Sequence, residues 1–369
     1  MRMVFRWFGE GNDSVKLSQI KQIPGVEGLV WALHDLPAGE VWPLERVQAM
    51  KRQADQFGFH IDVVESVNIH ESIKLGSDDR DYYIENYIKT VQHLATVGVK
   101  VICYNFMPVF DWIRTDLFGL LPDQSTALFY ESDKVRDMDP LELVQKIAAN
   151  PDYTMPGWEP ERLETLKGLF TAYQNVTNQD LMHHLKYFLE KVIPVCEEYD
   201  IKLAIHPDDP PWEIFTLPRI VTTQHQLKEI TQLVDSPYNG ITLCSGALGV
   251  LKENNIVTMI YDLRDRIHFA HIRNVQLFDN GGDFIETSHR TMDGSLPIDQ
   301  IVQAYHEIGY TGYVRPDHGR HIWNEDCRPG YGLYDRALGI MYLWGLWDAY
   351  QQIRGKDEVD VTNSLQFKR

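Results

Sequence analysis

Short apolar runs rich in β-branched and aromatic residues recur along the chain, and helical patterns separate most of them. Strands that alternate with helices are typical of βαβ units, in which the strands are parallel. The eight predicted strands are Val4–Gly9, Gly28–His34, His60–Ser66, Val99–Phe106, Lys202–Pro207, Gly240–Gly246, Ile267–Asn274 and Gly312–Asp317. The predicted helices are Leu17–Ile23, Leu44–Phe57, Arg80–Val97, Asp180–Tyr199, Gln224–Val234, Asn254–Tyr261, Ile298–Ile308 and Tyr334–Ile353.

Eight strand–helix repeats predict a closed (β/α)8 TIM barrel. The alternative is a doubly wound open sheet, which is expected to carry a glycine-rich phosphate-binding turn after an early strand. The chain has no such turn, because Ser245–Gly249 (SGALG) is too short to form one. No linker or low-complexity segment divides the sequence, so we expect residues 1–369 to form a single domain.

One connection is much longer than the others. Residues 107–179, between the fourth and fifth predicted strands, form an aromatic-rich insertion that carries the motifs WIRTDL and MPGW. We assign no strand to this insertion. Long insertions without a strand are usually functional or interfacial, so we expect either a lid over the barrel or an oligomer contact.

The composition restricts the partners and the compartment. The net charge of −18 opposes binding to nucleic acid or to an anionic membrane, but it does not oppose binding of a small anion. The N-terminus lacks a secretory signal pattern, and no apolar run approaches the roughly 20 residues that span a bilayer. We therefore expect a cytoplasmic protein whose cysteines are free thiols or ligands. The four cysteines lie far apart, at Cys103, Cys196, Cys244 and Cys327.

Metal-binding side chains follow four consecutive strands. Barrel enzymes place their functional groups at the carboxyl ends of the strands. At these ends the fifth to eighth strands carry His206, Cys244, His271 and Asp317. Each residue alone has a structural explanation, but four candidates at matching strand ends predict one shared metal ion. On the seventh strand we prefer His271 to His268, because it lies nearer the strand end and shares its face with apolar neighbours.

The mixed nitrogen, sulfur and oxygen donors favour a transition metal, with Fe²⁺ or Zn²⁺ slightly ahead of Mn²⁺. His318 follows Asp317 directly, and adjacent strand residues point to opposite sides. One of the two can therefore bind the metal while the other reaches a substrate. Histidine titrates near neutrality, so His318 is the candidate acid or base.

Several long motifs resemble the mannonate dehydratase family. They are FRWFG, ALHDLPAGEVW, CYNFMPVFDWIRTDL, IHPDDPP, LPRIV, TLCSG, HFAHIRN, RPDHGR and RPGYG, in this order between about residues 4 and 345. The resemblance implies a metal-dependent, xylose-isomerase-like TIM barrel in the cytoplasm. Such an enzyme uses Mn²⁺ or Fe²⁺ to dehydrate D-mannonate to 2-dehydro-3-deoxy-D-gluconate in hexuronate (glucuronate) breakdown.

The family motifs also carry residue roles. They imply that His206, Cys244, His271 and Asp317 bind the metal, and that His318 and Tyr331, the tyrosine of RPGYG, form the acid–base pair. We leave open which of the pair is the base. A phenol, with a reference pKa of about 10, is a natural acid, and it acts as a base only if its pKa is lowered. We expect a homodimer or a larger homo-oligomer.

Other polar side chains near the strand ends are candidates for substrate binding. Each also has a structural explanation, such as a surface salt bridge for Arg114, packing at the barrel mouth for His34, or a role in shaping the proline-rich turn for Asp208. The substrate-binding candidates are His34, His70, Asn105, Arg114, Asp208 and Arg273.

Three other functions compete with the dehydratase. A metal-dependent sugar isomerase of the same barrel class is the main alternative, but such enzymes rely on several carboxylates and a lysine, whereas this set has a thiolate and no lysine. A metal-dependent abasic-site endonuclease requires a basic groove, which the net charge of −18 disfavours. A sugar-acid-binding protein without activity has no need of His318 beside Asp317.

Overall fold

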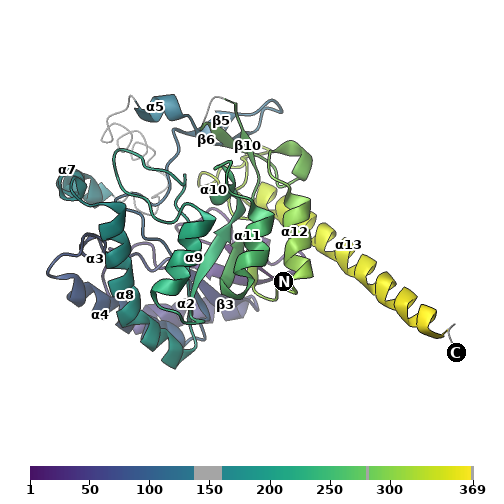
Figure 1. Cartoon of the computed structure of the whole chain (residues 1–369), viewed down its shortest axis with the longest axis horizontal. Helices are drawn as coiled ribbons and strands as arrows, with labels where there is room; N and C mark the ends of the chain where they lie inside the picture. Colours follow the sequence, from purple (N-terminus) through teal and green to yellow (C-terminus); the bar gives the residue numbers. More distant parts are fainter. Residues whose placement is uncertain (137–159, 280–281, 367–369) are drawn as a thin grey trace.

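The barrel predicted from the sequence is present. A computed structural model describes residues 1–136, 160–279 and 282–366. Eight parallel strands close in the order β1-β12-β9-β8-β7-β4-β3-β2, which confirms the TIM barrel and excludes the open sheet (Figure 1). The barrel strands are β1 Arg2–Arg6, β2 Val26–Trp31, β3 His60–Glu65, β4 Val101–Tyr104, β7 Lys202–Ile205, β8 Asn239–Cys244, β9 Ile267–His271 and β12 Tyr313–Arg315.

Each strand ends one to three residues before the predicted position. His206, Asp317 and His318 therefore lie in the first residues of the following loops, whereas Cys244 and His271 are the last residues of β8 and β9. Small and branched side chains fill the barrel interior beneath them, among them Val30, Val63 and Ala204. The polar groups of the candidate site lie at the carboxyl end of the barrel, where TIM-barrel enzymes carry their functional groups.

Helices surround the barrel and bury their apolar faces against it. In α12, for example, Ile298, Ile301 and Val302 are buried, and they recur at the spacing of one helix face. Every predicted helix is present. The outer helices are α1 Leu17–Ile20, α2 Leu44–Gln56, α4 Arg80–Ala95, α8 Asn178–Tyr199, α9 Gln224–Leu233, α11 Ile256–Leu263, α12 Ile298–Glu307 and α13 Leu333–Gln366. Two short helices, α3 Glu71–Leu75 and α10 Ser245–Gly249, follow β3 and β8.

The insertion contains strands, so the expectation of a strand-free segment was wrong. Its strands β5 (Asp116–Leu120) and β6 (Thr126–Tyr130) join β10 (Val275–Leu277) and β11 (Phe284–Glu286), which come from the loop after β9. Together they form an antiparallel sheet in the order β10-β11-β6-β5. Figure 1 shows this sheet above the carboxyl end of the barrel, where α10 begins. We call it the upper sheet.

The upper sheet escapes prediction because its pairing is long-range. Residues 284 and 285 pair with residues 130 and 129, more than 150 positions earlier in the chain. The rest of the insertion includes α5 (Ser132–Arg136) and α7 (Pro160–Tyr173). MPGW, one of the motifs noted in the insertion, lies outside the described residues.

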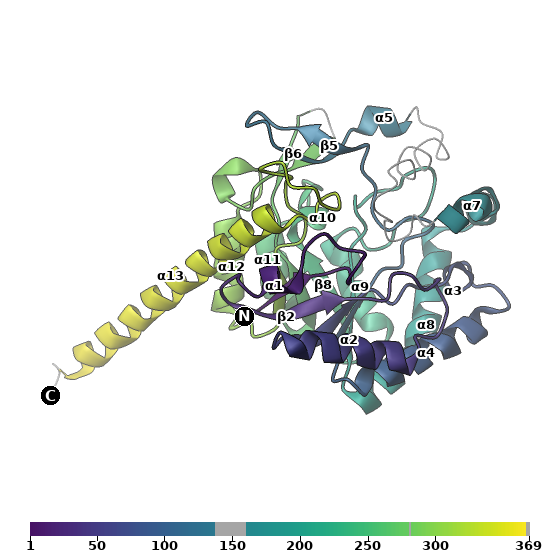
Figure 2. The same ribbon diagram turned by 180° about the vertical axis from the view of Figure 1, so that it is seen from behind.

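The last helix, α13, leaves the body of the protein. Both ribbon views show its far half projecting beyond the barrel, while its near half lies beside α12 (Figures 1 and 2). Ile340 and Leu343 of the near half are buried, whereas Leu338 and Met341 on another face are 47% and 45% exposed. Among the described helices, none is both long enough and apolar enough to span a membrane.

Candidate active site

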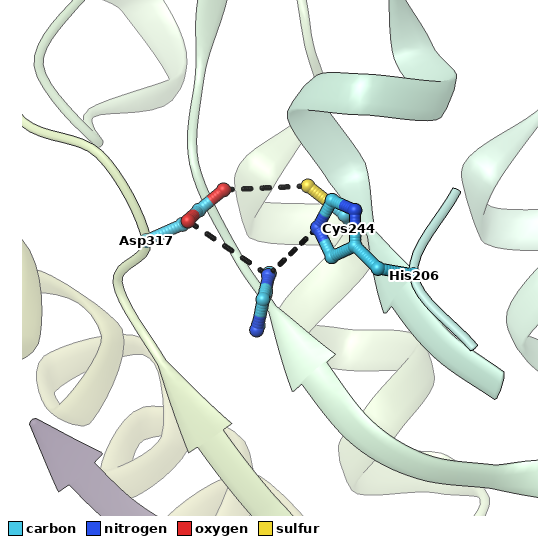
Figure 3. Close-up of side chains that lie close together, drawn as sticks. His206, Cys244 and Asp317 are labelled. Atoms are coloured by element: carbon cyan, nitrogen blue, oxygen red, sulfur yellow. Dashed lines mark hydrogen bonds and ion pairs between the residues drawn. The ribbon is translucent and has the colours of Figure 1, made fainter. Parts of the chain in front are cut away.

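Four neighbouring strands bring the predicted metal ligands together. Donor atoms of His206, Cys244, His271 and Asp317 all lie within 4.8 Å of one another. Strand register explains this, because Cys244 lies directly opposite His271, and His271 lies opposite Arg315, two residues before Asp317. Figure 3 shows the side chains of Cys244 and Asp317 pointing toward each other, with His206 beside Cys244.

The distances between the donor atoms suit a small divalent cation. His206 Nε2 lies 3.2 Å from His271 Nδ1, Cys244 Sγ lies 3.4 Å from Asp317 Oδ2, and His271 Nδ1 lies 3.8 Å from Asp317 Oδ1. Metal–ligand bonds of about 2.0–2.3 Å place neighbouring tetrahedral ligands roughly 3.3–3.8 Å apart. These three distances lie in or close to that range, so the four residues are candidates to share one metal ion.

Hydrogen bonds orient the first histidine for metal binding. His206 Nδ1 lies 2.7 Å from the Pro207 carbonyl oxygen. A carbonyl oxygen only accepts, so Nδ1 carries the proton and Nε2 presents a lone pair to the other ligands. Asp317 is held at φ 54°, in the left-handed region. This conformation costs an L-residue roughly 1–2 kcal/mol, and aspartate tolerates it better than most. Such local strain is common at functional sites.

A second carboxylate lies behind His271. His271 Nε2 is 3.6 Å from Glu65 Oε2 and 3.0 Å from Arg315 Nε. Arg315 also forms ion pairs of 2.8 Å with Glu65 and with Asp317. Burial alone would raise the pKa of Glu65, but Arg315 and His271 hold it well below its usual range. Arg315 Nε donates to His271 Nε2, and Glu65 Oε2 is buried and has no hydrogen-bond partner.

Glu65 also belongs to a second possible ligand group, with Cys103 and His271. One feature argues against a metal ion there. Burial raises the pKa of the Cys103 thiol well above its usual value, which disfavours the thiolate that binds metals. The donor set with Cys244 is therefore the better candidate for a metal site.

His318 and Tyr331 form a hydrogen-bonded pair beside the metal ligands. His318 Nε2 lies 3.0 Å from Tyr331 Oη, and both residues are buried. Trp112, from the insertion, packs on the His318 ring at 5.4 Å between centroids. Burial raises the pKa of Tyr331, although Arg315 opposes this effect. The phenol therefore keeps its proton near neutral pH.

Tyr334, the other tyrosine of this segment, has a different environment. It is 40% exposed and packs against Trp323. The structure thus distinguishes the two tyrosines, because only Tyr331 contacts His318.

A buried network of two arginines and two carboxylates adjoins this pair. Arg114 forms a bidentate pair with Asp209, at 2.9 and 3.1 Å, and its Nη2 lies 2.9 Å from Glu286 Oε1. Arg273 contacts Asp209 at 2.6 Å, Asp317 at 2.7 Å, and Glu286. Burial alone would raise the pKa of Asp209, but Arg114 and Arg273 lower it. The network ties the insertion, through Arg114, to the barrel.

Arg114 was expected to bind a substrate carboxylate or to form a surface salt bridge. Its Nη donors instead face protein carboxylates, and it is fully buried. Removing one partner of a buried ion pair typically costs 3–5 kcal/mol. We expect Arg114→Met to lower the free energy of unfolding by about 3–5 kcal/mol, measured by denaturant titration. The matched control is Lys100→Met, which removes the exposed Lys100–Asp200 pair and is expected to cost less than about 1 kcal/mol. Equal losses in the two variants would contradict a structural role for Arg114.

The other substrate-binding candidates have protein partners in the structure. Asp208 accepts a hydrogen bond from the Val221 amide at 2.8 Å and pairs with Arg219, and burial raises its pKa. His70 caps α3 and stacks on Tyr83 at 3.5 Å. Within the described residues, these recorded bonds of Asp208 do not reach the candidate metal ligands or the His318–Tyr331 pair.

Two candidates lie at the start of their loops. Asn105 donates to Asp111 at 2.9 Å and accepts from the Met107 amide, so it holds the beginning of the insertion. His34 lies 3.3 Å from an Arg6 nitrogen. Burial, with Arg6 adding to the effect, lowers the pKa of His34 well below its usual value. His34 is therefore neutral, and its neighbour Arg6 contributes a positive charge near Tyr331.

Glu286 is one of several site residues that the sequence analysis missed. Its Oε1 lies 2.8 Å from His318 Nδ1, and it is completely buried. The signal in the sequence was weak, namely one acidic residue in the apolar run FIE (Phe284–Glu286). Because no barrel strand was predicted there, the glutamate was not associated with a strand end.

Comparisons with known proteins agree with this geometry. The family model described as D-mannonate dehydratase (UxuA) matches residues 1–357. Mannonate dehydratase 1 of Halalkalibacterium halodurans is 68% identical over 95% of this chain and 97% of its own length, and the mannonate dehydratase of Bacillus subtilis is 55% identical over 97% and 99%. The crystal structure of mannonate dehydratase from Streptococcus suis serotype 2 superimposes with a TM-score of 0.87 at 40% identity, covering 96% of both chains.

More distant structures share the fold alone. A xylose isomerase domain protein from Planctomyces limnophilus, 12% identical, covers 95% of this chain and 99% of its own, with a TM-score of 0.55. The family model matches nearly the whole chain, and several curated relatives are more than half identical to it. Together these matches establish the family. The chain belongs to the D-mannonate dehydratase family.

Proposed function

We propose that the protein dehydrates D-mannonate to 2-dehydro-3-deoxy-D-gluconate and water. The observation that carries this proposal is the hydrogen-bonded pair of His318 and Tyr331 directly beside a four-residue metal-ligand set. Family membership supports the same reaction. A sugar isomerase of this barrel class remains the alternative, and the absence of lysine from the described ligand group and acid–base pair weighs against it.

In this proposal His206, Cys244, His271 and Asp317 hold a divalent metal, Mn²⁺ or Fe²⁺. The bound ion supplies positive charge for the substrate carboxylate and the negative charge that develops on it. The barrel places His318 next to the ligand Asp317, so its ring borders the substrate. The buried surroundings of the pair exclude water and strengthen its polar interactions.

The direction of the tyrosine pKa supports an assignment of roles. His318 Nε2 takes the proton from C2, and the electrons of the C2–H bond form the C2–C3 double bond. The C3–O bond breaks, and Tyr331 gives its phenolic proton to the departing hydroxyl, which leaves as water. The proton on His318 then returns to Tyr331 Oη across the 3.0 Å hydrogen bond. The enol product takes a proton from solvent at C3, releases the proton of its C2 hydroxyl to solvent, and becomes the 2-keto acid.

An assay in heavy water tests the reaction. The metal-loaded protein is incubated with D-mannonate in D₂O, and the product is examined by NMR and by 2-keto acid detection. We expect a 2-keto acid with deuterium at C3. An isomerised sugar acid without loss of water would favour the isomerase, and unchanged D-mannonate would indicate a binding protein. Either result would reject the dehydratase.

A substitution of Glu65 tests the metal site. We propose that Glu65 holds the His271 ring in place, through its 3.6 Å contact with Nε2 and through Arg315, which pairs with Glu65 and donates to Nε2. Loss of such a partner typically weakens metal binding about 10–100-fold, and we expect this loss for Glu65→Gln. Competition with a chromophoric chelator measures the metal Kd. Cys103→Ser is the control, and its Kd and metal stoichiometry should match the wild type. A lower stoichiometry in the control would instead indicate a second metal site.

The setting of the reaction is also part of the proposal. A dehydratase for D-mannonate fits hexuronate breakdown in the cytoplasm. We further infer a homodimer or larger homo-oligomer, because α13 exposes Leu338 and Met341 on one side and Trp323, next to Tyr334, is 69% exposed. Light scattering of the purified protein measures the assembly, and a monomer at working concentration would contradict it.

A further inference from the structure

Glu286 occupies a position that structural stability alone does not require. It lies on β11 of the upper sheet, outside the barrel, yet its side chain is completely buried and reaches Arg273 and His318 in the loops that follow β9 and β12. Its Oε1 faces Arg114, Arg273 and His318 Nδ1, while Oε2 is buried without a hydrogen-bond partner. A carboxylate that served only to pair with two arginines would gain most by presenting one oxygen to each. Here a single oxygen, Oε1, accepts hydrogen bonds from both arginines and from His318.

The contact with His318 determines which ring nitrogen carries the proton. A carboxylate oxygen accepts, so the 2.8 Å contact places a proton on His318 Nδ1. In the neutral ring, Nε2 then has a lone pair directed at Tyr331 Oη, 3.0 Å away. The hydrogen bonds thus run in one direction, from the Tyr331 hydroxyl to His318 and from His318 to Glu286. When the tyrosine hydroxyl turns toward a leaving group, the Nε2 lone pair becomes free.

We propose that Glu286 is a positioning residue of the reaction, which holds the His318 ring in the orientation and tautomer that present Nε2 to Tyr331 and the substrate. This proposal rests on the dehydratase function proposed above. In this proposal the upper sheet holds Glu286 in place, because β11, which carries Glu286, pairs with β6 of the insertion. The insertion then acts as a fixed support for the acid–base pair.

The two arginines make this support rigid. Arg114 and Arg273 both bind Asp209 as well as Glu286, so the Glu286 carboxylate is fixed from two sides. Burial alone would raise the pKa of Glu286, but Arg273 and His318 beside it lower that pKa below its usual range. The carboxylate therefore stays ionised and remains an acceptor for the Nδ1 proton.

Two substitutions separate positioning from simple charge pairing. Glu286→Asp keeps the charge that faces the arginines but withdraws the oxygen from His318 by one methylene. Glu286→Gln loses the charge but keeps an oxygen where Oε1 lies. We measure kcat and KM for D-mannonate, metal stoichiometry and Tm for both metal-loaded variants. The control is Glu71→Asp, which changes another buried, ion-paired glutamate that bonds Lys74 and Tyr173.

We expect Glu286→Asp to lower kcat about 10–100-fold, the usual range for losing the partner that orients a functional histidine, with KM within about threefold of the wild type. Glu286→Gln should retain a higher kcat than Glu286→Asp, although it is the less thermostable of the two because two arginines lose a counter-charge. A merely structural role predicts the reverse, with kcat following Tm. That result, or wild-type kcat in Glu286→Asp, would overturn the proposal.

A double variant tests whether Glu286 acts through His318. Adding Glu286→Asp to His318→Asn should cause no further loss of activity beyond about threefold, because residues that act as a unit are not additive. Losses that multiply would show that Glu286 acts elsewhere and would contradict the proposal. Failure of the dehydratase function would be distinguishable, since the wild-type enzyme would then form no 2-keto acid in the same assay.

Discussion

Replacing His318 with asparagine is expected to lower kcat about 10²–10⁴-fold, the usual contribution of a general acid or base. The substitution removes Nε2, which bonds Tyr331, but leaves the four ligand side chains in place. Metal stoichiometry should therefore remain that of the wild type. Steady-state 2-keto acid formation and metal analysis of the same preparation measure both quantities.

The two tyrosines of the same segment provide a matched comparison. Tyr331→Phe removes only the hydroxyl and keeps the ring contacts with His318 and Phe8, so we expect a large loss of kcat with little loss of stability. Tyr334→Phe, at the exposed position beside Trp323, should leave kcat unchanged. Equal activities of the two variants would contradict the role of Tyr331, and loss of metal from His318→Asn would contradict the division between ligands and acid–base pair.

Removal of the metal is expected to abolish activity to the background of the assay. Without the cation, the negative charge that develops on the substrate has no comparable stabilisation, and metal ions supply several kcal/mol of such stabilisation. After treatment with a chelator, Mn²⁺, Fe²⁺, Zn²⁺ and Mg²⁺ are added back separately under anaerobic conditions. We expect Mn²⁺ or Fe²⁺ to restore 2-keto acid formation. Activity that survives chelation would reject the metal-dependent mechanism.

Two histidines on β9 give this experiment an internal control. His271 belongs to the candidate ligand group. His268 lies outside that group and packs against Gly240. We expect His271→Gln to lose metal affinity and activity, and His268→Gln to retain the metal affinity of the wild type. Similar metal affinities in the two variants would contradict the ligand assignment.

Local pattern was sufficient to predict the barrel and the convergence of its strand ends. His206, Cys244, His271 and Asp317 each follow or end an apolar run, and parallel strands bring such positions to one edge. The period of two along a strand also distinguished His271 from His268. Tyr331 had no comparable signal, since it lies in a loop, and only the family motif RPGYG indicated it.

Long-range pairing explains what the sequence did not reveal. The sequence analysis named Arg114 as a candidate for substrate binding. Its partners in the structure, Asp209 and Glu286, lie 95 and 172 positions away in the chain. The upper sheet likewise depends on pairing between two loops, and β5 alone, with its sequence DLFGL, does not alternate strictly between buried and exposed residues. No local rule selects such partners.

The division between barrel and upper sheet makes the active site modular. All four proposed metal ligands lie at the ends of barrel strands or within two residues after them, so the barrel itself carries the proposed metal site. The groups that orient the acid–base histidine come from loops added above it. Loops vary more readily than the elements they connect. The loops above such a barrel can therefore change, and the chemistry with them, while the strand ends that carry the proposed metal ligands stay the same.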